Sequence, residues 1–139
     1  MKFIELGNKK WRVLALCDQK EDCQILDHLI VSKLSSPAWR KMTARLTQMV
    51  PENGPEFNNR KKVKMQDDGI YAFREQPPRG PKPRVYFFRD GNDLICTEAI
   101  DKRNDNVTGI IRNAKIVRER YFEAKESNQI EIEKYDGEQ

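Results

Sequence analysis

Residues 63–100 read VKMQDDGIYAFREQPPRGPKPRVYFFRDGNDLICTEAI, and this stretch decides the fold. Its short apolar runs are separated by two turn signals, Asp68-Gly69 and Asp90-Gly91-Asn92. An Asp-Gly pair between strand-like runs is a strong signal for a tight hairpin. Residues 76–83 hold four of the seven prolines and predict a longer loop. We expect residues 70–74, 84–89 and 93–100 to form an antiparallel meander.

The segments on either side predict further elements. Residues 11–16 favour a strand because they are apolar and partly β-branched. Apolar residues at three-to-four spacing predict one helix over residues 22–34 and a second from Pro37 to about residue 50. Ser36 suits the N-cap of the second helix, and Pro37 suits its first position. Residues 106–125 predict a C-terminal helix with an apolar face that ends at Tyr121.

Together these elements predict an α+β fold of one domain. We expect a small antiparallel sheet, a meander of three to five strands, with two N-terminal helices and one C-terminal helix packed on one face. With 139 residues, the chain has material for one modest core. We assign residues 1–125 to this domain and residues 126–139 to an acidic tail, either a short edge strand or disordered.

Composition excludes several classes of function. No apolar run approaches the roughly 20 residues of a membrane-spanning helix, and the N-terminus is polar by Glu5, so we expect a cytoplasmic protein. Cys17, Cys23 and Cys96 form an odd, scattered set that predicts reduced, buried thiols. His28 is the single histidine and no CxxC motif accompanies it, so we expect no metal site.

The charge is unevenly distributed along the chain. Residues 60–90 hold nine bases and four acids, a net charge of +5, while residues 123–139 hold two bases and six acids, a net charge of −4. A basic centre suits a partner that carries phosphates. The alternative is a solvated charged surface without a partner, and charge alone leaves both open.

Four motifs, in this order, resemble the RelE/ParE/HigB toxins of bacterial toxin–antitoxin systems. The hairpin of residues 64–74 resembles the family's lysine, acidic-Gly turn and Tyr-x-aliphatic-Arg pattern. Residues 83–88 resemble its central strand, which begins with an arginine, and residues 99–103 resemble the end of its last strand with a basic pair. Residues 110–121 resemble its closing helix.

The resemblance implies a toxin that cuts mRNA in the decoding site of the ribosome and so inhibits translation. In that reaction the 2′-hydroxyl attacks the adjacent phosphate, which needs a base for the hydroxyl, cations for the phosphate and an acid for the leaving 5′-oxygen. It implies no metal and no cofactor. Its partners would be the ribosome, mRNA and a cognate antitoxin protein, and the toxin would be a monomer or part of a hetero-oligomer with the antitoxin.

Carried over residue by residue, the resemblance assigns catalytic roles to Arg84, Arg74 and Lys102. Arg84 matches the arginine that stabilises the phosphate, Arg74 an arginine that closes the preceding strand, and Lys102 the first of the basic pair. RNA-binding roles fall to five further cations: Arg60, Lys61, Lys62, Lys64 and Arg103. Except for Lys61, we expect all of these cations to converge on one concave basic face: Arg60, Lys62, Lys64, Arg74, Arg84, Lys102 and Arg103.

Two departures from the family pattern leave the chemistry open. Ile70 and Ala72 stand where the RelE type has lysines, and the family's late tyrosine or histidine has no counterpart. The general base therefore stays unidentified. The alternatives to a ribonuclease are a catalytically inactive RelE-fold module that binds its partner without cutting it, and an inhibitor of gyrase of the ParE type.

Overall fold

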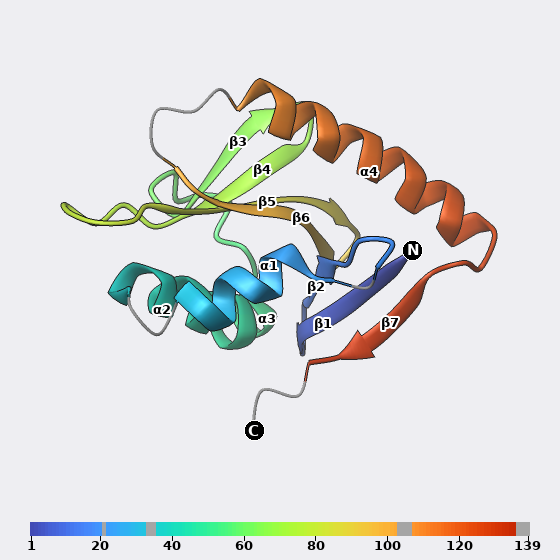
Figure 1. Ribbon diagram of the computed structural model, residues 1–139, viewed down its shortest axis with the longest axis horizontal. Coiled ribbons are helices and arrows are strands. Elements are labelled where there is room, and N and C mark those ends of the chain that lie inside the picture. Colours follow the sequence, from blue (N-terminus) through green and yellow to red (C-terminus); the bar gives the residue numbers. More distant parts are fainter. Residues whose placement is uncertain (21, 33–35, 103–106, 136–139) are drawn as a thin grey trace.

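The structure, a computed structural model, describes residues 1–20, 22–32, 36–102 and 107–135. It is built of one sheet between two helical layers (Figure 1). The strands are listed here in chain order: β1 (Lys2–Asn8), β2 (Arg12–Leu16), β3 (Val63–Asp67), β4 (Ile70–Arg74), β5 (Pro83–Asp90), β6 (Asp93–Asp101) and β7 (Glu131–Lys134). In the part of the chain described, no helix is long and apolar enough to cross a membrane.

The helices fall into two runs and one long C-terminal helix. The first run is α1 (Gln24–Asp27) with the π-helical segment η1 (His28–Ser32). The second is α2 (Pro37–Ala44), the π-helical η2 (Arg45–Met49) and α3 (Val50–Asn53). The Ser36 hydroxyl caps α2 by accepting the Trp39 N–H at 3.3 Å, as its sequence position predicts. The C-terminal helix is α4 (Thr108–Glu126).

The predicted sheet is wrong in size and in kind. Instead of an antiparallel meander of three to five strands, the sheet is mixed and has seven, in the order β3-β4-β5-β6-β2-β1-β7. The pairs β3–β4, β4–β5, β5–β6 and β1–β2 are antiparallel, so the predicted meander of β4, β5 and β6 is confirmed as one part of it. The pairs β2–β6 and β1–β7 are parallel.

The two parallel pairs join segments that are far apart in the sequence. β2 lies against β6, and the Arg12 guanidinium there makes two hydrogen bonds with the Asp93 carboxylate, at 2.9 and 2.7 Å. β7 lies against β1 and forms the second edge of the sheet. Residues 131–134 of the predicted tail are therefore an edge strand, and residues 136–139 lie outside the described residues.

Both faces of the sheet are covered, so the expectation of helices on one face over one core is wrong. The α1–α3 side holds a core with Trp39, Met42, Phe73 and Phe87, among others. The α4 side holds a second, smaller core that includes Phe88. Every residue of β5 from Pro83 to Phe88 is buried, and its apolar side chains serve both layers: Val85 and Phe87 belong to the first core and Phe88 to the second.

Polar contacts from the middle and the C-terminal part of α4 hold the helix against the sheet. Near the C-terminal end of the helix, Asp90 accepts hydrogen bonds from the Tyr121 hydroxyl at 2.7 Å and from Lys125 Nζ at 2.5 Å. In the middle of the helix, Lys115 and Arg118 contact the β3–β4 turn through Asp67 and Asp68. α4 therefore lies across the sheet face opposite α1–α3 (Figure 1), which leaves the ends of β4, β5 and β6 beside the proline-rich loop uncovered by it.

Candidate phosphate-binding cavity

A basic cavity of about 590 Å³ lies where β4 and β6 end and β5 begins. Four cations and one carboxylate take part in its wall. The full lining is Arg74, Gln76, Gly80, Pro81, Lys82, Arg84, Asp101 and Lys102. The loop between β4 and β5 projects beyond the body of the molecule at this end (Figure 1), so the cavity opens to solvent beside it.

Strand register brings these residues together. Arg74 is the residue directly opposite Arg84 on neighbouring strands, and Pro83 is opposite Asp101. The loop is then fastened to the end of β6, because Asp101 Oδ1 accepts the Lys82 N–H at 2.7 Å and the Lys102 N–H donates to the Lys82 carbonyl at 2.9 Å. Lys82 and Lys102 therefore face the same space as the two arginines, although they lie in different segments.

Arg84 is the buried member of the group, with an exposed fraction of 4%. Its Nη1 donates to the carbonyls of Glu75 at 3.1 Å and Pro83 at 2.9 Å. Burial lowers the pKa of Arg84, and the charge of Arg74 lowers it further. The predicted phosphate-binding arginine therefore forms part of the cavity wall and also supports the backbone of the loop.

Arg74 is more accessible and is held in place by two hydrogen bonds. Its Nη1 donates to the Arg60 carbonyl at 3.0 Å and its Nη2 to Gln76 Oε1 at 2.9 Å. Both acceptors are neutral, so the guanidinium is positioned without losing its charge to an ion pair. Such a cation is suited to contact an anion that enters the cavity.

The pKa of Lys102 reflects the positive electrostatic potential of the cavity. Partial burial lowers its pKa, and four nearby cations lower it further: Arg84, Arg74, Lys64 and Lys82. An opposing charge would relieve this repulsion, because an anion beside a lysine favours the charged form. The positive potential of the cavity therefore favours the binding of an anion.

A buried ion pair that the sequence did not predict supports the cavity from behind. Arg45 and Glu75 have side chains only 7% exposed, and Arg45 Nη1 lies 2.7 Å from Glu75 Oε2. Arg45 also donates to the carbonyls of Arg74 at 2.7 Å and Lys62 at 2.9 Å. Since Glu75 in turn holds Arg84 through its carbonyl, these contacts link η2 to both arginines of the cavity.

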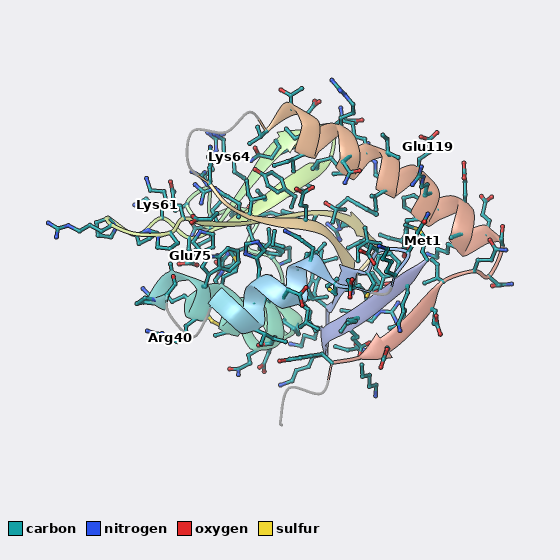
Figure 2. The ribbon with its side chains drawn as sticks, viewed as in Figure 1. Met1, Arg40, Lys61, Lys64, Glu75 and Glu119 are labelled. Carbon is teal, nitrogen blue, oxygen red and sulfur yellow. The ribbon has the colours of Figure 1, made fainter. Side chains whose placement is uncertain are left out.

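The remaining predicted RNA-binding residues do not all reach the cavity. Lys64 is exposed on β3, close enough to lower the pKa of Lys102. Lys62 pairs instead with Glu75 at 3.3 Å, and Lys61 lines an adjoining groove. Arg60 contributes its carbonyl to Arg74, and Arg103 lies outside the described residues. Figure 2 places Lys61, Lys64 and Glu75 toward the same end of the molecule, far from Met1 and Glu119.

Lys82 is the cation that the sequence assignment missed. The available signal was its position between Pro81 and Pro83, since two prolines restrict the backbone and present the side chain between them from a stiff loop. His28 lies elsewhere, with its ring 5.0 Å from that of Trp39. Residues 131–134 of the tail lie away from the cavity, because β7 pairs with β1 at the opposite edge of the sheet from β3.

Comparison with known proteins gives no relative for this chain: no family model, no curated protein and no solved structure matches it. We therefore infer the function of the protein from the cavity and from the sequence motifs around it.

Proposed function

We propose that the protein binds single-stranded RNA and holds a backbone phosphate in the basic cavity. The observation that supports this proposal most strongly is the convergence of Arg74, Lys82 and Lys102 on one space in which the pKa of Lys102 is already lowered. Cations that repel one another are stabilised when a phosphate comes between them. Arg74 and Lys102 are also residues that the resemblance to the RelE-type toxins assigns to RNA.

The toxin activity that this resemblance implies is part of the same proposal. A ribosome-bound mRNA would then be the ligand, and a cognate antitoxin the partner that blocks the cavity. Cleavage would transfer the 2′-hydroxyl proton to a base as the 2′-oxygen bonds to phosphorus, and the leaving 5′-oxygen would take a proton from an acid, giving a 2′,3′-cyclic phosphate and a 5′-hydroxyl.

One observation favours cleavage in addition to binding. The cavity holds a carboxylate, Asp101, among its four cations, and a carboxylate can accept a proton, which a charged arginine or lysine cannot. Inducible expression in a bacterium, with mapping of mRNA 5′-ends, tests this step. Growth arrest with new mRNA ends in the wild type, lost in Asp101→Asn or Lys102→Gln, is the expected result. If expression of the wild type leaves the mRNA ends unchanged, the protein does not cut mRNA and only the binding proposal stands.

Replacing Lys102 with glutamine tests the binding proposal. We expect RNA affinity at low salt to fall roughly 10- to 150-fold, because a charge-assisted hydrogen bond is typically worth 1.5–3 kcal/mol. The slope of log affinity against log salt should fall by about 0.7 for one lost cation on a single strand. Fluorescence anisotropy with a labelled oligonucleotide measures both quantities, and Lys134→Gln, exposed on β7, is the matched control.

Lys102→Gln should also make the protein more stable. Replacing a lysine whose role is only structural would instead leave the stability unchanged or lower it. Since the folded-state pKa of Lys102 is lowered, the unfolded chain binds that proton more tightly. Lys102 therefore destabilises the fold wherever lysine is charged, and this penalty disappears as pH rises through its folded-state pKa. A higher Tm for Lys102→Gln at neutral pH is expected. A lower Tm together with unchanged RNA affinity would contradict the proposal.

A further inference from the structure

A groove leads from the basic cavity toward the second helical run. It has a volume of about 360 Å³ and shares Arg74 and Gln76 with the cavity. Its remaining lining comes from α2 and from residues on both sides of the hairpin: Pro37, Ala38, Lys41, Lys61, Lys62, Glu75, Pro77 and Pro78. Lys41 and Lys61 are exposed, so two accessible cations follow the groove beyond the cavity.

The groove continues into a smaller hollow of about 280 Å³. Lys41, Lys62 and Glu75 line both the groove and the hollow, so the cavity, the groove and the hollow adjoin one another along this side of the molecule. The hollow is formed by η2, α3 and the loop that follows, and its lining is Lys41, Ala44, Arg45, Met49, Val50, Asn53, Gly54, Glu56, Lys62 and Glu75.

The hollow differs chemically from the cavity. Aliphatic surface from Ala44, Met49 and Val50 lines the hollow, and Glu75 pairs with both Arg45 and Lys62. With Glu56 and Lys41, the lining holds two carboxylates and three cations, whereas the cavity holds one carboxylate and four cations. A phosphate is therefore less favoured in the hollow than in the cavity, whereas a flat, uncharged ring with hydrogen-bond donors on its edge suits it.

We propose that this hollow is a nucleobase subsite. An RNA strand with one phosphate in the cavity would follow the lysines of the groove and place a neighbouring base against Met49, with its edge toward Asn53 and Glu56. Methionine suits such a contact, because its flexible, polarisable thioether adapts to flat rings. The inference rests on the proposed function, and it adds recognition of a base to the binding of the backbone.

The test compares two RNA ligands of equal charge on three proteins. The ligands are a heptanucleotide and an abasic strand with the same number of phosphates. The proteins are the wild type, Met49→Glu and Gln48→Glu. Met49 is 51% exposed and lines the hollow, while the neighbouring Gln48 is exposed and does not line it, so the two variants carry the same added charge on the same helical segment.

The wild type should bind the heptanucleotide roughly tenfold more tightly than the abasic strand, as expected for one well-placed base. Met49→Glu should remove most of this ratio, and Gln48→Glu should keep it. The ratio is the decisive quantity because general electrostatic effects of the added charge cancel in it. Thermal melts should show both variants folded, since each replaces an exposed residue.

The outcomes separate this inference from the proposal on which it rests. If Met49→Glu and Gln48→Glu give the same ratio, the hollow is not a base subsite, while loss of affinity in Lys102→Gln still supports the phosphate site. If the wild type binds neither strand, the proposed function fails and the subsite fails with it. If it binds both strands equally, the backbone is bound and the base subsite is wrong.

Discussion

Glu75→Ala is expected to reduce the free energy of unfolding by about 3–5 kcal/mol, the range for removing one partner of a buried ion pair. The substitution would leave the guanidinium of Arg45 buried without its counter-charge, since Glu75 lies 2.7 Å from it and both side chains are only 7% exposed. Urea unfolding followed by circular dichroism measures the change.

Glu52→Ala is the matched control for this prediction. Glu52 pairs with Lys9 at 3.6 Å, and both side chains are more than half exposed, so its loss should change stability by about 0–1 kcal/mol. The double variant Arg45→Leu with Glu75→Leu should recover part of the loss, because no unpaired charge stays buried. Equal effects of Glu75→Ala and Glu52→Ala would show that the buried pair contributes little.

The same variant separates positioning from charge at the cavity. By charge alone, removing the Glu75 carboxylate from beside a basic site would raise RNA affinity. We expect the opposite, because Arg45 donates to the Arg74 carbonyl and is itself held by the Glu75 carboxylate, so the loss of this carboxylate would leave Arg74 without a fixed support. The backbone carbonyl of residue 75, which accepts from Arg84, is kept in this variant. RNA affinity that rises in folded Glu75→Ala would contradict a positioning role for the pair.

The second large effect is expected from reversing two charges in the cavity. Lys82→Glu combined with Lys102→Glu should lower RNA affinity at low salt on the order of 10²–10⁴-fold, since two charge-assisted contacts are lost. The loss should shrink as salt is added, because phosphate contacts are salt-dependent. Anisotropy titrations over a salt series measure it.

A double variant with the same change in net charge provides the control. Arg120 on α4 and Lys134 on β7 are both exposed, and neither lines the cavity. Arg120→Glu with Lys134→Glu should therefore weaken binding only by the general change in net charge. If the two double variants lose affinity equally, the affinity for RNA depends on the overall charge of the protein, and the cavity is not the binding site.

The features that the sequence predicts correctly are local ones. The turns at Asp68-Gly69 and at Asp90-Gly91 are encoded within a few residues and yield the antiparallel pairs β3–β4 and β5–β6, while the proline-rich loop joins the antiparallel pair β4–β5. This pairing in turn places Arg74 opposite Arg84 and carries Lys102 to the same end of the sheet. The core of the cavity therefore follows from hairpin register together with the positions of three cations.

The features that the sequence does not predict depend on contacts over long distances along the chain. β2 and β6 pair through residues such as Arg12 and Asp93, which are 81 positions apart, and no turn signal marks a parallel pair. The uninterrupted apolar run Val85–Phe88 was a usable sign that both faces of the sheet are covered. Lys62 and Glu75 appear in sequence as ordinary surface charges, and only their packing against η2 shows that they support the site.

The central claim is that RNA binds at the basic cavity, and backbone amide NMR of the labelled protein during titration with a short oligonucleotide tests it most directly. We predict saturable shifts at Arg74, Gln76, Lys82 and Lys102, with the amides in the middle of α4 unchanged. Shifts concentrated on α4 or β7, with the cavity amides unmoved at saturation, would contradict the account.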